Sequence, residues 1–148
     1  MTTIAWDGVS LAGDKQLSTN GWKSRGTKVQ KAGKYLLGYS GPADAGVAML
    51  EWFVSGHKKE TFPAIQANRD TNCTLLVVDT KHKAGEARIL RYDCSPSPLV
   101  VEEPRYAIGT GREIALTAMF LGKTAEEAIE VASLFDDSTG MGVDVLVP

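Results

Sequence analysis

The pattern of apolar and polar positions predicts short strands that come in groups. Thr2–Trp6 and Val9–Gly13 are strand-like and flank Asp7-Gly8, a pair typical of a two-residue type I′ hairpin turn. Ser18–Gly26 is polar and punctuated by glycine, which predicts a loop. The remaining strands are expected at Lys34–Ser40, Cys73–Thr80, Arg88–Asp93, Leu99–Glu102, Tyr106–Gly109 and Val143–Val147.

Three helices are expected from their start signals and apolar spacing. The first runs over Pro42–Ser55, with proline at an early position and an acid in the first turn. The other two begin with capping boxes, in which a threonine is followed three residues later by glutamate. These boxes are Thr110 with Glu113 and Thr124 with Glu127. Lys58–Asp70 is weakly patterned and predicts at most a short helix.

The order strands, helix, strands, two helices, strand favours an α+β fold over one in which strands and helices alternate. It fits a four-layer αββα sandwich, in which two antiparallel sheets face each other and helices cover their outer faces. No linker, repeat or low-complexity tract interrupts the sequence. We therefore expect a single domain over residues 1–148.

Composition narrows the classes of function. Sixteen Lys and Arg residues against eighteen Asp and Glu give a net charge of −2, which argues against a nucleic-acid or anionic-membrane partner. Apolar runs such as Leu75–Val78 are too short to span a bilayer, and the first residues do not resemble a secretory signal. Cys73 and Cys94 suit reduced thiols in a cytoplasm. His57 and His82 lack the spacing of metal ligands.

The N-terminus carries a candidate nucleophile. With Asp7-Gly8 as a two-residue turn, Thr2 faces Gly13, and Asp14 lies beside the start of the chain. Once Met1 is removed, Thr2 carries a free α-amine whose ordinary pKa of about 7.7–8.0 lets it accept the hydroxyl proton near neutral pH. A nearby lysine would favour deprotonation of the threonine and of its amine through like-charge repulsion. Many chains with a small second residue share this much.

Four segments resemble a known family in the same order along the chain. They are TTIAWDG…LAGDKQ, GTKVQKAGKYLLGYSG, YAIGTGREIA and TAEEAIEVASLFDDSTGMGVDVLV. Together they resemble the catalytic β-type subunits of the proteasome family, and most of all the small bacterial HslV-like peptidases. The resemblance implies an N-terminal nucleophile (Ntn) hydrolase, with the expected sandwich fold. The family's second long helix is shortened or lost in this chain.

The resemblance implies roles for individual residues. Thr2 matches the nucleophile that forms the acyl-enzyme, Asp14 the acid that orients the site's lysine, and Lys28 that lysine. A backbone N–H near Gly38 is expected to stabilise the oxyanion, with Gly41 as the alternative. Each residue also has a structural explanation, because Asp14 ends a strand, Lys28 is one of several neighbouring lysines, and Gly38 suits close packing.

Two further matches lie in the second half of the chain. Thr110 stands where the family usually has serine, near the nucleophile's amine, although it is also a candidate helix cap. The family's Asp-x-x-Ser feature is matched by Asp136 with Thr139, or with a one-residue gap by Asp137.

The predicted function is that of a threonine-type endopeptidase subunit acting on peptides or unfolded proteins. The resemblance implies a cytoplasmic homo-oligomeric ring, with an ATP-dependent unfoldase as a possible partner. It implies neither cofactor nor metal, because the chain itself supplies nucleophile, base and oxyanion donors. Two alternatives stay open: a non-catalytic ring scaffold, and a small-molecule amidohydrolase of the same nucleophile class.

Overall fold

The computed structural model describes residues 2–65 and 73–148. Its helices are α1 (Ala43–Val54), the 3-10 turn η1 (Lys59–Thr61), α2 (Arg112–Phe120) and α3 (Ala125–Phe135). Its strands are β1 (Thr3–Trp6), β2 (Leu11–Asp14), β3 (Gln16–Thr19), β4 (Trp22–Arg25), β5 (Val29–Ala32), β6 (Tyr35–Ser40), β7 (Thr74–Lys83), β8 (Glu86–Asp93), β9 (Leu99–Val101), β10 (Tyr106–Gly109) and β11 (Val143–Leu146).

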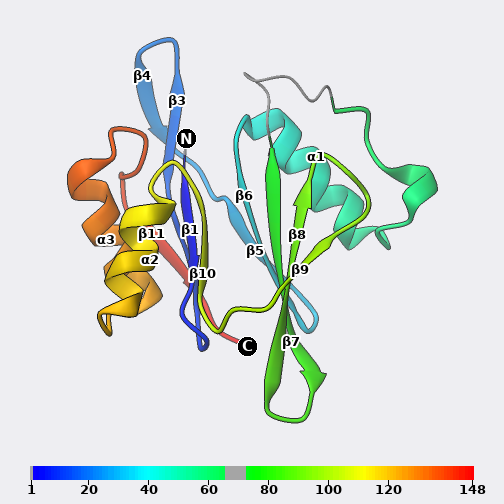
Figure 1. Cartoon of the computed structure of the whole chain (residues 1–148). Coiled ribbons are helices and arrows are strands. Elements are labelled where there is room, and N and C mark those ends of the chain that lie inside the picture. Colours follow the sequence, from blue (N-terminus) through cyan, green and yellow to red (C-terminus); the bar gives the residue numbers. More distant parts are fainter. Residues whose placement is uncertain (1, 66–72) are drawn as a thin grey trace.

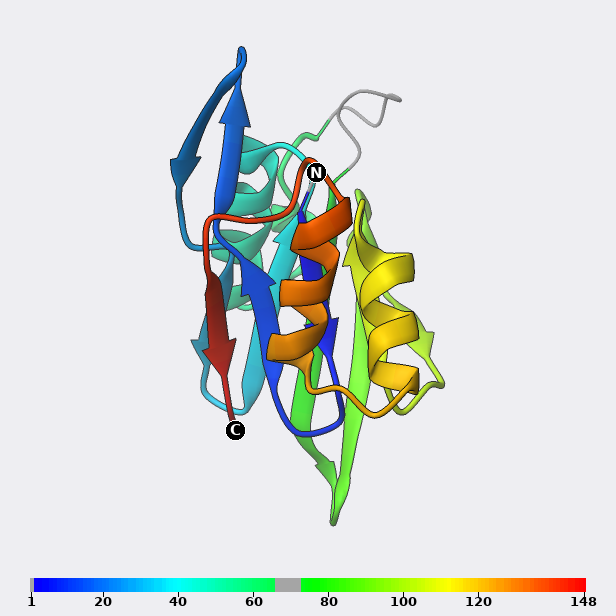
Figure 2. The same ribbon diagram turned by 90° about the vertical axis from the view of Figure 1, so that its left-hand side faces the viewer.

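The elements form four layers (Figure 1). One sheet has the strand order β10-β1-β2-β11 and the other β5-β6-β7-β8-β9, with antiparallel pairing throughout. Helices α2 and α3 cover the outer face of the first sheet, and α1 covers the outer face of the second (Figures 1 and 2). The predicted αββα sandwich is confirmed. No helix in the two described stretches has the length and apolarity needed to cross a membrane.

The space between the sheets is filled by branched and aromatic side chains. Ile4 of β1, Leu36 of β6 and Leu76 of β7 are fully buried there. A second apolar cluster lies under α1 around Trp52 and Phe53, and a third, rich in alanine, lies under α2 and α3. The two sheets are thereby held face to face, so residues at one end of both sheets converge on one site.

The first hairpin differs from its prediction by two residues in register. Ile4 pairs with Gly13, not Leu11, because the connection is a four-residue loop over residues 7–10. The Asp7 carboxylate accepts hydrogen bonds from the backbone N–H groups of Val9 and Ser10, and this Asx-type loop replaces the two-residue turn. A shift of two preserves the facing of every side chain. It places Asp14 opposite Thr3, still beside the start of the chain.

The segment Ser18–Gly26 was predicted as a loop and is mostly a hairpin of β3 and β4. Asn20 and Gly21 both have positive φ and form the turn between them. All four residues of β4 are exposed, so the strand lacks the apolar alternation that sequence patterns detect. Strand β5 was also missed, since it has a single buried residue, Val29.

Of the two capping boxes predicted from the sequence, one is present. Thr124 and Glu127 form the predicted capping box at α3, with reciprocal bonds of 3.2 and 3.1 Å between side chain and backbone. The Thr110 capping box is wrong: α2 begins one residue later than expected, with Gly111 at its N-cap. Lys58–Asp70 contains only η1 up to residue 65, and the rest of that prediction lies outside the described residues.

Gly38 of β6 faces the space between the two sheets. A β-carbon built on it would lie 2.7 Å from Cγ2 of Ile4 and 3.3 Å from Cγ1 of Val29. These methyl groups belong to β-branched side chains that have few alternative rotamers. Glycine at this position therefore lets β6 approach β1 closely.

We predict that Gly38→Ala lowers the free energy of unfolding by about 1–3 kcal/mol through overpacking, as measured by urea denaturation. In an Ile4→Leu background, which moves the branch away from Cβ at constant volume, the same substitution should cost less. An equal cost in both backgrounds would contradict the packing explanation.

Candidate active site

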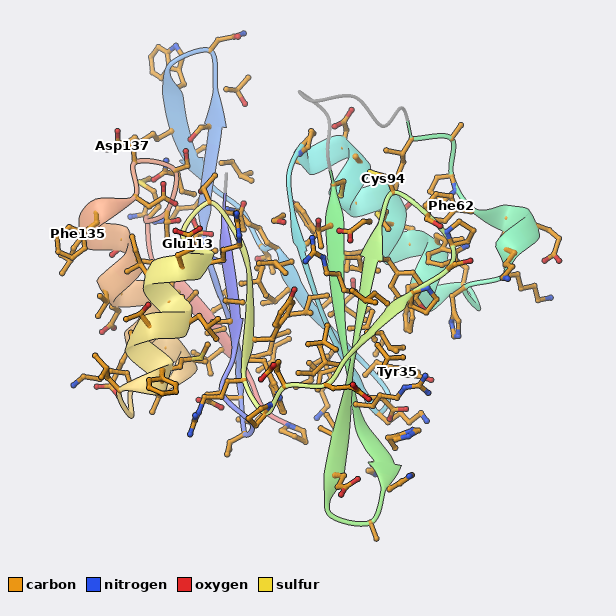
Figure 3. All side chains as sticks on the ribbon, viewed as in Figure 1. Tyr35, Phe62, Cys94, Glu113, Phe135 and Asp137 are labelled. Carbon is orange, nitrogen blue, oxygen red and sulfur yellow. The ribbon has the colours of Figure 1, made fainter. Side chains whose placement is uncertain are left out.

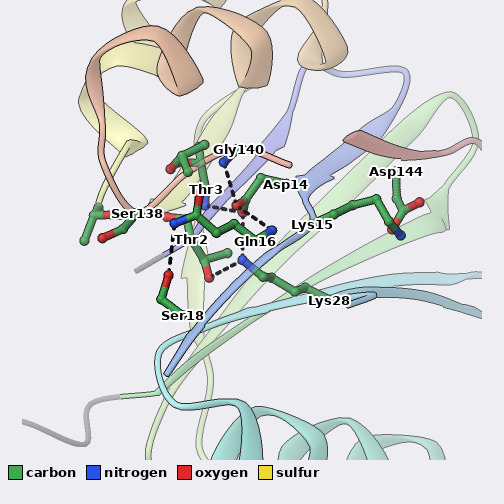
Figure 4. Close-up of polar contacts among 12 residues, drawn as sticks. Thr2, Thr3, Asp14, Lys15, Gln16, Ser18, Lys28, Ser138, Gly140 and Asp144 are labelled. Atoms are coloured by element: carbon green, nitrogen blue, oxygen red, sulfur yellow. Dashed lines mark hydrogen bonds and ion pairs between the residues drawn. The ribbon is translucent and has the colours of Figure 1, made fainter. Parts of the chain in front are cut away.

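Three elements bring Thr2, Asp14 and Lys28 together at the end of the two sheets (Figure 4). Thr2 directly precedes β1, Asp14 ends the neighbouring strand β2, and Lys28 directly precedes β5 in the opposite sheet. All three are buried. Residues that sequence analysis assigned to nucleophile, acid and lysine therefore lie in contact across the space between the sheets.

The carboxylate of Asp14 is fully buried and accepts four hydrogen bonds. Oδ1 accepts from the backbone N–H of Thr3 at 3.0 Å and from Nζ of Lys28 at 3.0 Å. Oδ2 accepts from the backbone N–H groups of Gln16 at 3.2 Å and Gly140 at 3.1 Å. Saturation of both oxygens offsets the cost of burying the charge and fixes the carboxylate's orientation.

The ammonium group of Lys28 joins this carboxylate to the candidate nucleophile. Nζ donates to Oγ1 of Thr2 at 2.8 Å and to Oδ1 of Asp14 at 3.0 Å, and the side chain is 1% exposed. Burial lowers the pKa of Lys28 below its ordinary 10.5, and the charge of Asp14 only partly offsets that effect. A cation in this position stabilises negative charge that develops on the threonine oxygen.

A second hydrogen-bond network lies behind the N-terminus. Asp136 accepts hydrogen bonds from the hydroxyls of Thr110, at 2.6 Å, and Thr139. Because Thr139 uses its proton there, the hydroxyl of Thr3 must donate to Oγ1 of Thr139, 2.6 Å away. Burial raises the pKa of Asp136, but these hydroxyls and the N–H of Ser138 outweigh it, so the pKa is lowered overall. The carboxylate is thereby kept ionised as an acceptor.

This network settles two choices left open by the sequence. Asp136, not Asp137, contacts the residues around the N-terminus, since the Asp137 side chain is exposed and only its carbonyl oxygen accepts a hydrogen bond from Gln16. The hydroxyl of Thr110 also lies 3.4 Å from the carbonyl oxygen of Thr2. Thr110 donates its hydroxyl proton to Asp136, after the end of α3, and does not cap α2.

Gly38 is not placed to stabilise an oxyanion. It pairs with Val29 and Leu76 inside the sheet, and its open side faces Ile4. Gly41 follows β6 and lines the cavity beside Thr2. Its φ of +104° favours glycine, since other residues are strained in that conformation. Of the two glycines considered from the sequence, Gly41 is therefore the one that lines the cavity beside Thr2.

A cavity of about 370 Å³ opens beside Thr2 and Lys28. Its walls come from β3 and β4 on one side and from the start of α1 on the other, and its lining includes Ser18, Tyr39, Gly41 and Asp44. The volume is within the range of small-molecule and side-chain pockets. Thr2 therefore faces a space large enough for the side chain of a bound substrate.

Sequence reasoning missed three contributors to the site. Thr3 supplies a backbone N–H to Asp14, Gln16 bridges Ser18 and the carbonyl of Asp137 through its amide, and the carbonyl oxygen of Ser138 accepts from the N–H of Thr2 at 3.3 Å (Figure 4). Two of these contacts use backbone atoms, which residue identity does not reveal. In the described part of the chain, no three His, Cys, Asp or Glu residues gather in a way that could hold a metal ion.

We predict that the buried ion pair is asymmetric in its contribution to stability. Asp14→Asn leaves Lys28 with an uncompensated buried charge. It also places the NH2 group of the new amide against two backbone N–H donors, so that donors face each other. The substitution should therefore lower the free energy of unfolding by about 3–5 kcal/mol. Lys28→Met should cost less, because Asp14 keeps three N–H donors. Urea denaturation measures both. A larger loss for Lys28→Met, or additive losses in the double variant, would contradict this account.

Comparison with known proteins places the fold. No protein-family model matches the sequence, and no curated protein matches it. Among solved structures, Thiobacillus denitrificans BPH in complex with epoxomicin has a TM-score of 0.70 at 16% identity, with 99% of this chain and 97% of that chain covered. Eukaryotic HslV from Trypanosoma brucei has a TM-score of 0.70 at 17% identity, with the same coverage. The chain therefore has the fold of the HslV-like, proteasome-type Ntn hydrolases.

Proposed function

We propose that the protein is a threonine-type endopeptidase, in which Thr2 becomes the N-terminal nucleophile after removal of Met1. One observation carries the proposal: Nζ of Lys28 lies 2.8 Å from Oγ1 of Thr2, inside a cavity-lining site where Asp14 holds the ammonium group. Burying a lysine costs free energy that an apolar side chain of similar size would not cost, so packing alone does not explain its position. The arrangement fits N-terminal nucleophile chemistry, in which a neighbouring base activates the threonine hydroxyl.

The reaction follows from these groups. The neutral α-amine of Thr2 accepts the hydroxyl proton as Oγ1 attacks the substrate's carbonyl carbon, and the cation of Lys28 stabilises the developing charge. The backbone N–H of Gly41 is assigned to the tetrahedral oxyanion. Collapse breaks the peptide C–N bond, the amine proton passes to the leaving nitrogen, and an ester to Oγ1 remains. Water, deprotonated by the same amine, then hydrolyses the ester and restores the threonine.

Assembly into a homo-oligomeric ring is part of the proposal. Large apolar side chains are exposed on the outer helical layer, among them Phe120 at 79% and Phe135 at 74%, and Figure 3 shows Phe135 pointing away from the body of the protein. Exposed apolar groups of this size favour association between proteins. A chamber formed by several copies would admit only peptides and unfolded chains as substrates. We place this assembly in the cytoplasm, where an ATP-dependent unfoldase would deliver the unfolded chains.

We predict that Thr2→Ala reduces the hydrolysis of unstructured peptides at least about 10³-fold, because the nucleophile is lost. Thr2→Ser, which keeps a hydroxyl, should retain measurable turnover. Thr117→Ala serves as the matched control, since that hydroxyl is exposed on α2 and, among the described residues, bonds only to the carbonyl of Glu113. Undiminished hydrolysis by Thr2→Ala, with the fold intact by circular dichroism, would contradict the assignment of Thr2 as the nucleophile. The activity would then come from a contaminating peptidase, and the protein would be a non-catalytic scaffold.

The pH dependence of kcat/KM should be bell-shaped. The rising limb reports deprotonation of the α-amine of Thr2, a group whose ordinary pKa is about 7.7–8.0. The falling limb reports loss of the Lys28 proton and should lie below pH 10.5, since burial lowers the pKa of that lysine. Activity that decreases from pH 6 to 8 would be incompatible with an amine base.

A further inference from the structure

A second cavity, of about 430 Å³, lies beside the first. Gly41 lines both, so the two cavities meet at the residue assigned to the oxyanion. The second is lined by Ser40, Thr74 and Arg91 from the five-stranded sheet, and by Gly109, Thr110 and Arg112 from the other half of the molecule. Neither Thr2 nor Lys28 lines it, whereas both line the first.

This cavity is the polar end of the space between the sheets. Ser40 pairs with Thr74, and Arg91 pairs with Leu76, which faces the inter-sheet core. Residues two apart on a strand share a face, so Thr74 and Arg91 continue the row that Leu76 begins. Apolar packing thus gives way to hydroxyls and a guanidinium where the sheets separate, at the end of the molecule that carries the N-terminus (Figure 1).

Arg91 is held in place from both sheets. Nε donates to Asp93 at 3.0 Å, and Nη1 donates to the hydroxyl of Tyr106 on β10 at 2.8 Å. Burial lowers the pKa of Arg91, but Asp93 and Tyr106 outweigh that effect and raise it overall, so the side chain remains a cation. A guanidinium fixed by two neighbours costs little further ordering when it binds a ligand.

Arg112 faces the same cavity from the first turn of α2. Its Nη1 donates to the carbonyl oxygen of Gly109 at 3.0 Å, which directs the side chain back over the cavity rim. The carboxylate of Glu113 is 4.0 Å away, and both side chains are more than half exposed, so solvent screens that pair. The N-terminal end of α2 adds positive potential at the same place.

We propose that this second cavity is an anion-binding subsite that receives a carboxylate of the substrate on the leaving-group side of the scissile bond. Two guanidinium groups line it, whereas the carboxylates that contact its lining residues, Asp93, Glu113 and Asp136, lie outside the lining. The acyl part of the substrate occupies the first cavity, because Thr2 lines that one. The first cavity has one cation, Lys28, and one acid, Asp44, in its lining, so its formal charges cancel, whereas those that line the second cavity are both positive. This inference rests on the proposed function.

The carboxylate has two possible sources, an acidic side chain just after the scissile bond or the C-terminus of the substrate. Three matched quenched peptides separate them: one with Glu after the bond and an amidated end, one with Gln there and an amidated end, and one with Gln as a free C-terminal residue. Binding is measured by fluorescence anisotropy on Thr2→Ala, which cannot turn them over. Hydrolysis is measured on the protein with native Thr2.

The variants are Arg112→Gln and Arg112→Glu, because Arg112 is exposed and its replacement should not disturb the core. Arg105→Gln is the matched control: it removes one positive charge from an exposed position beside β10, at the end far from the site. Far-ultraviolet circular dichroism checks that each variant is folded.

The native protein should prefer a carboxylate peptide over the Gln amide about tenfold in affinity, the size of one charge-assisted hydrogen bond. Tighter binding of the Glu peptide would identify the acidic side chain as the source of the carboxylate. Tighter binding of the peptide with a free C-terminus would identify the terminus as the source. Arg112→Gln should reduce the preference to about twofold or less, Arg112→Glu should reverse it, and Arg105→Gln should leave it unchanged. Added salt should weaken it.

The outcomes separate this inference from the proposed function. Hydrolysis of all three peptides without a preference would overturn the subsite and leave the endopeptidase intact. A preference that depends on Arg112, with no hydrolysis of any peptide, would support the subsite and overturn the endopeptidase. A preference that survives Arg112→Glu would also overturn the subsite, since the charge would then be recognised elsewhere.

Discussion

The buried ion pair between Lys28 and Asp14 is the constraint on which the rest of the site depends. Each residue comes from a different sheet, so the pair forms only when the two sheets face each other in register. In return, the pair is stable only because Asp14 has backbone N–H partners on three further segments. The same packing of the two sheets therefore both completes the fold and positions the candidate nucleophile.

The residues around the N-terminus extend this coupling to the outer helical layer. Asp136 follows α3, and its hydroxyl partners Thr110 and Thr139 come from loops on either side of the helices. Thr3 joins this network through its hydroxyl and the Asp14 network through its backbone. Thr2 lies next to both networks, so its position is set by two sets of hydrogen bonds that Thr3 joins.

Much of the fold could be predicted because its central elements carry strong patterns. Tyr106–Gly109 was predicted to the residue, and the start of α3 was predicted from its capping box. The exposed hairpin of β3 and β4 was missed because its strands bury almost nothing. The register of the first hairpin was wrong because an Asp7 side chain, not a backbone turn type, organises that loop.

In the candidate site, the contributions of side chains could be predicted from residue types. The contributions of backbone atoms could not, because they do not depend on residue type. Lys28 and Asp14 were identified from the family resemblance, and the structure brings both into contact with the residues expected. Gly38 and Gly41 could not be separated by sequence, since the family resemblance does not fix the register over this segment. Their difference is steric: one lies against Ile4 in the core, the other opens onto two cavities.

The central claim is that Thr2 is a free and reactive N-terminal nucleophile. Intact-mass measurement of the protein from its native host, before and after treatment with a threonine-directed electrophile, tests it most directly. The account predicts a mass lacking Met1 and one adduct per chain, lost in Thr2→Ala. A mass that retains Met1, with no adduct, would contradict it and leave the Lys28–Asp14 pair as a structural element only.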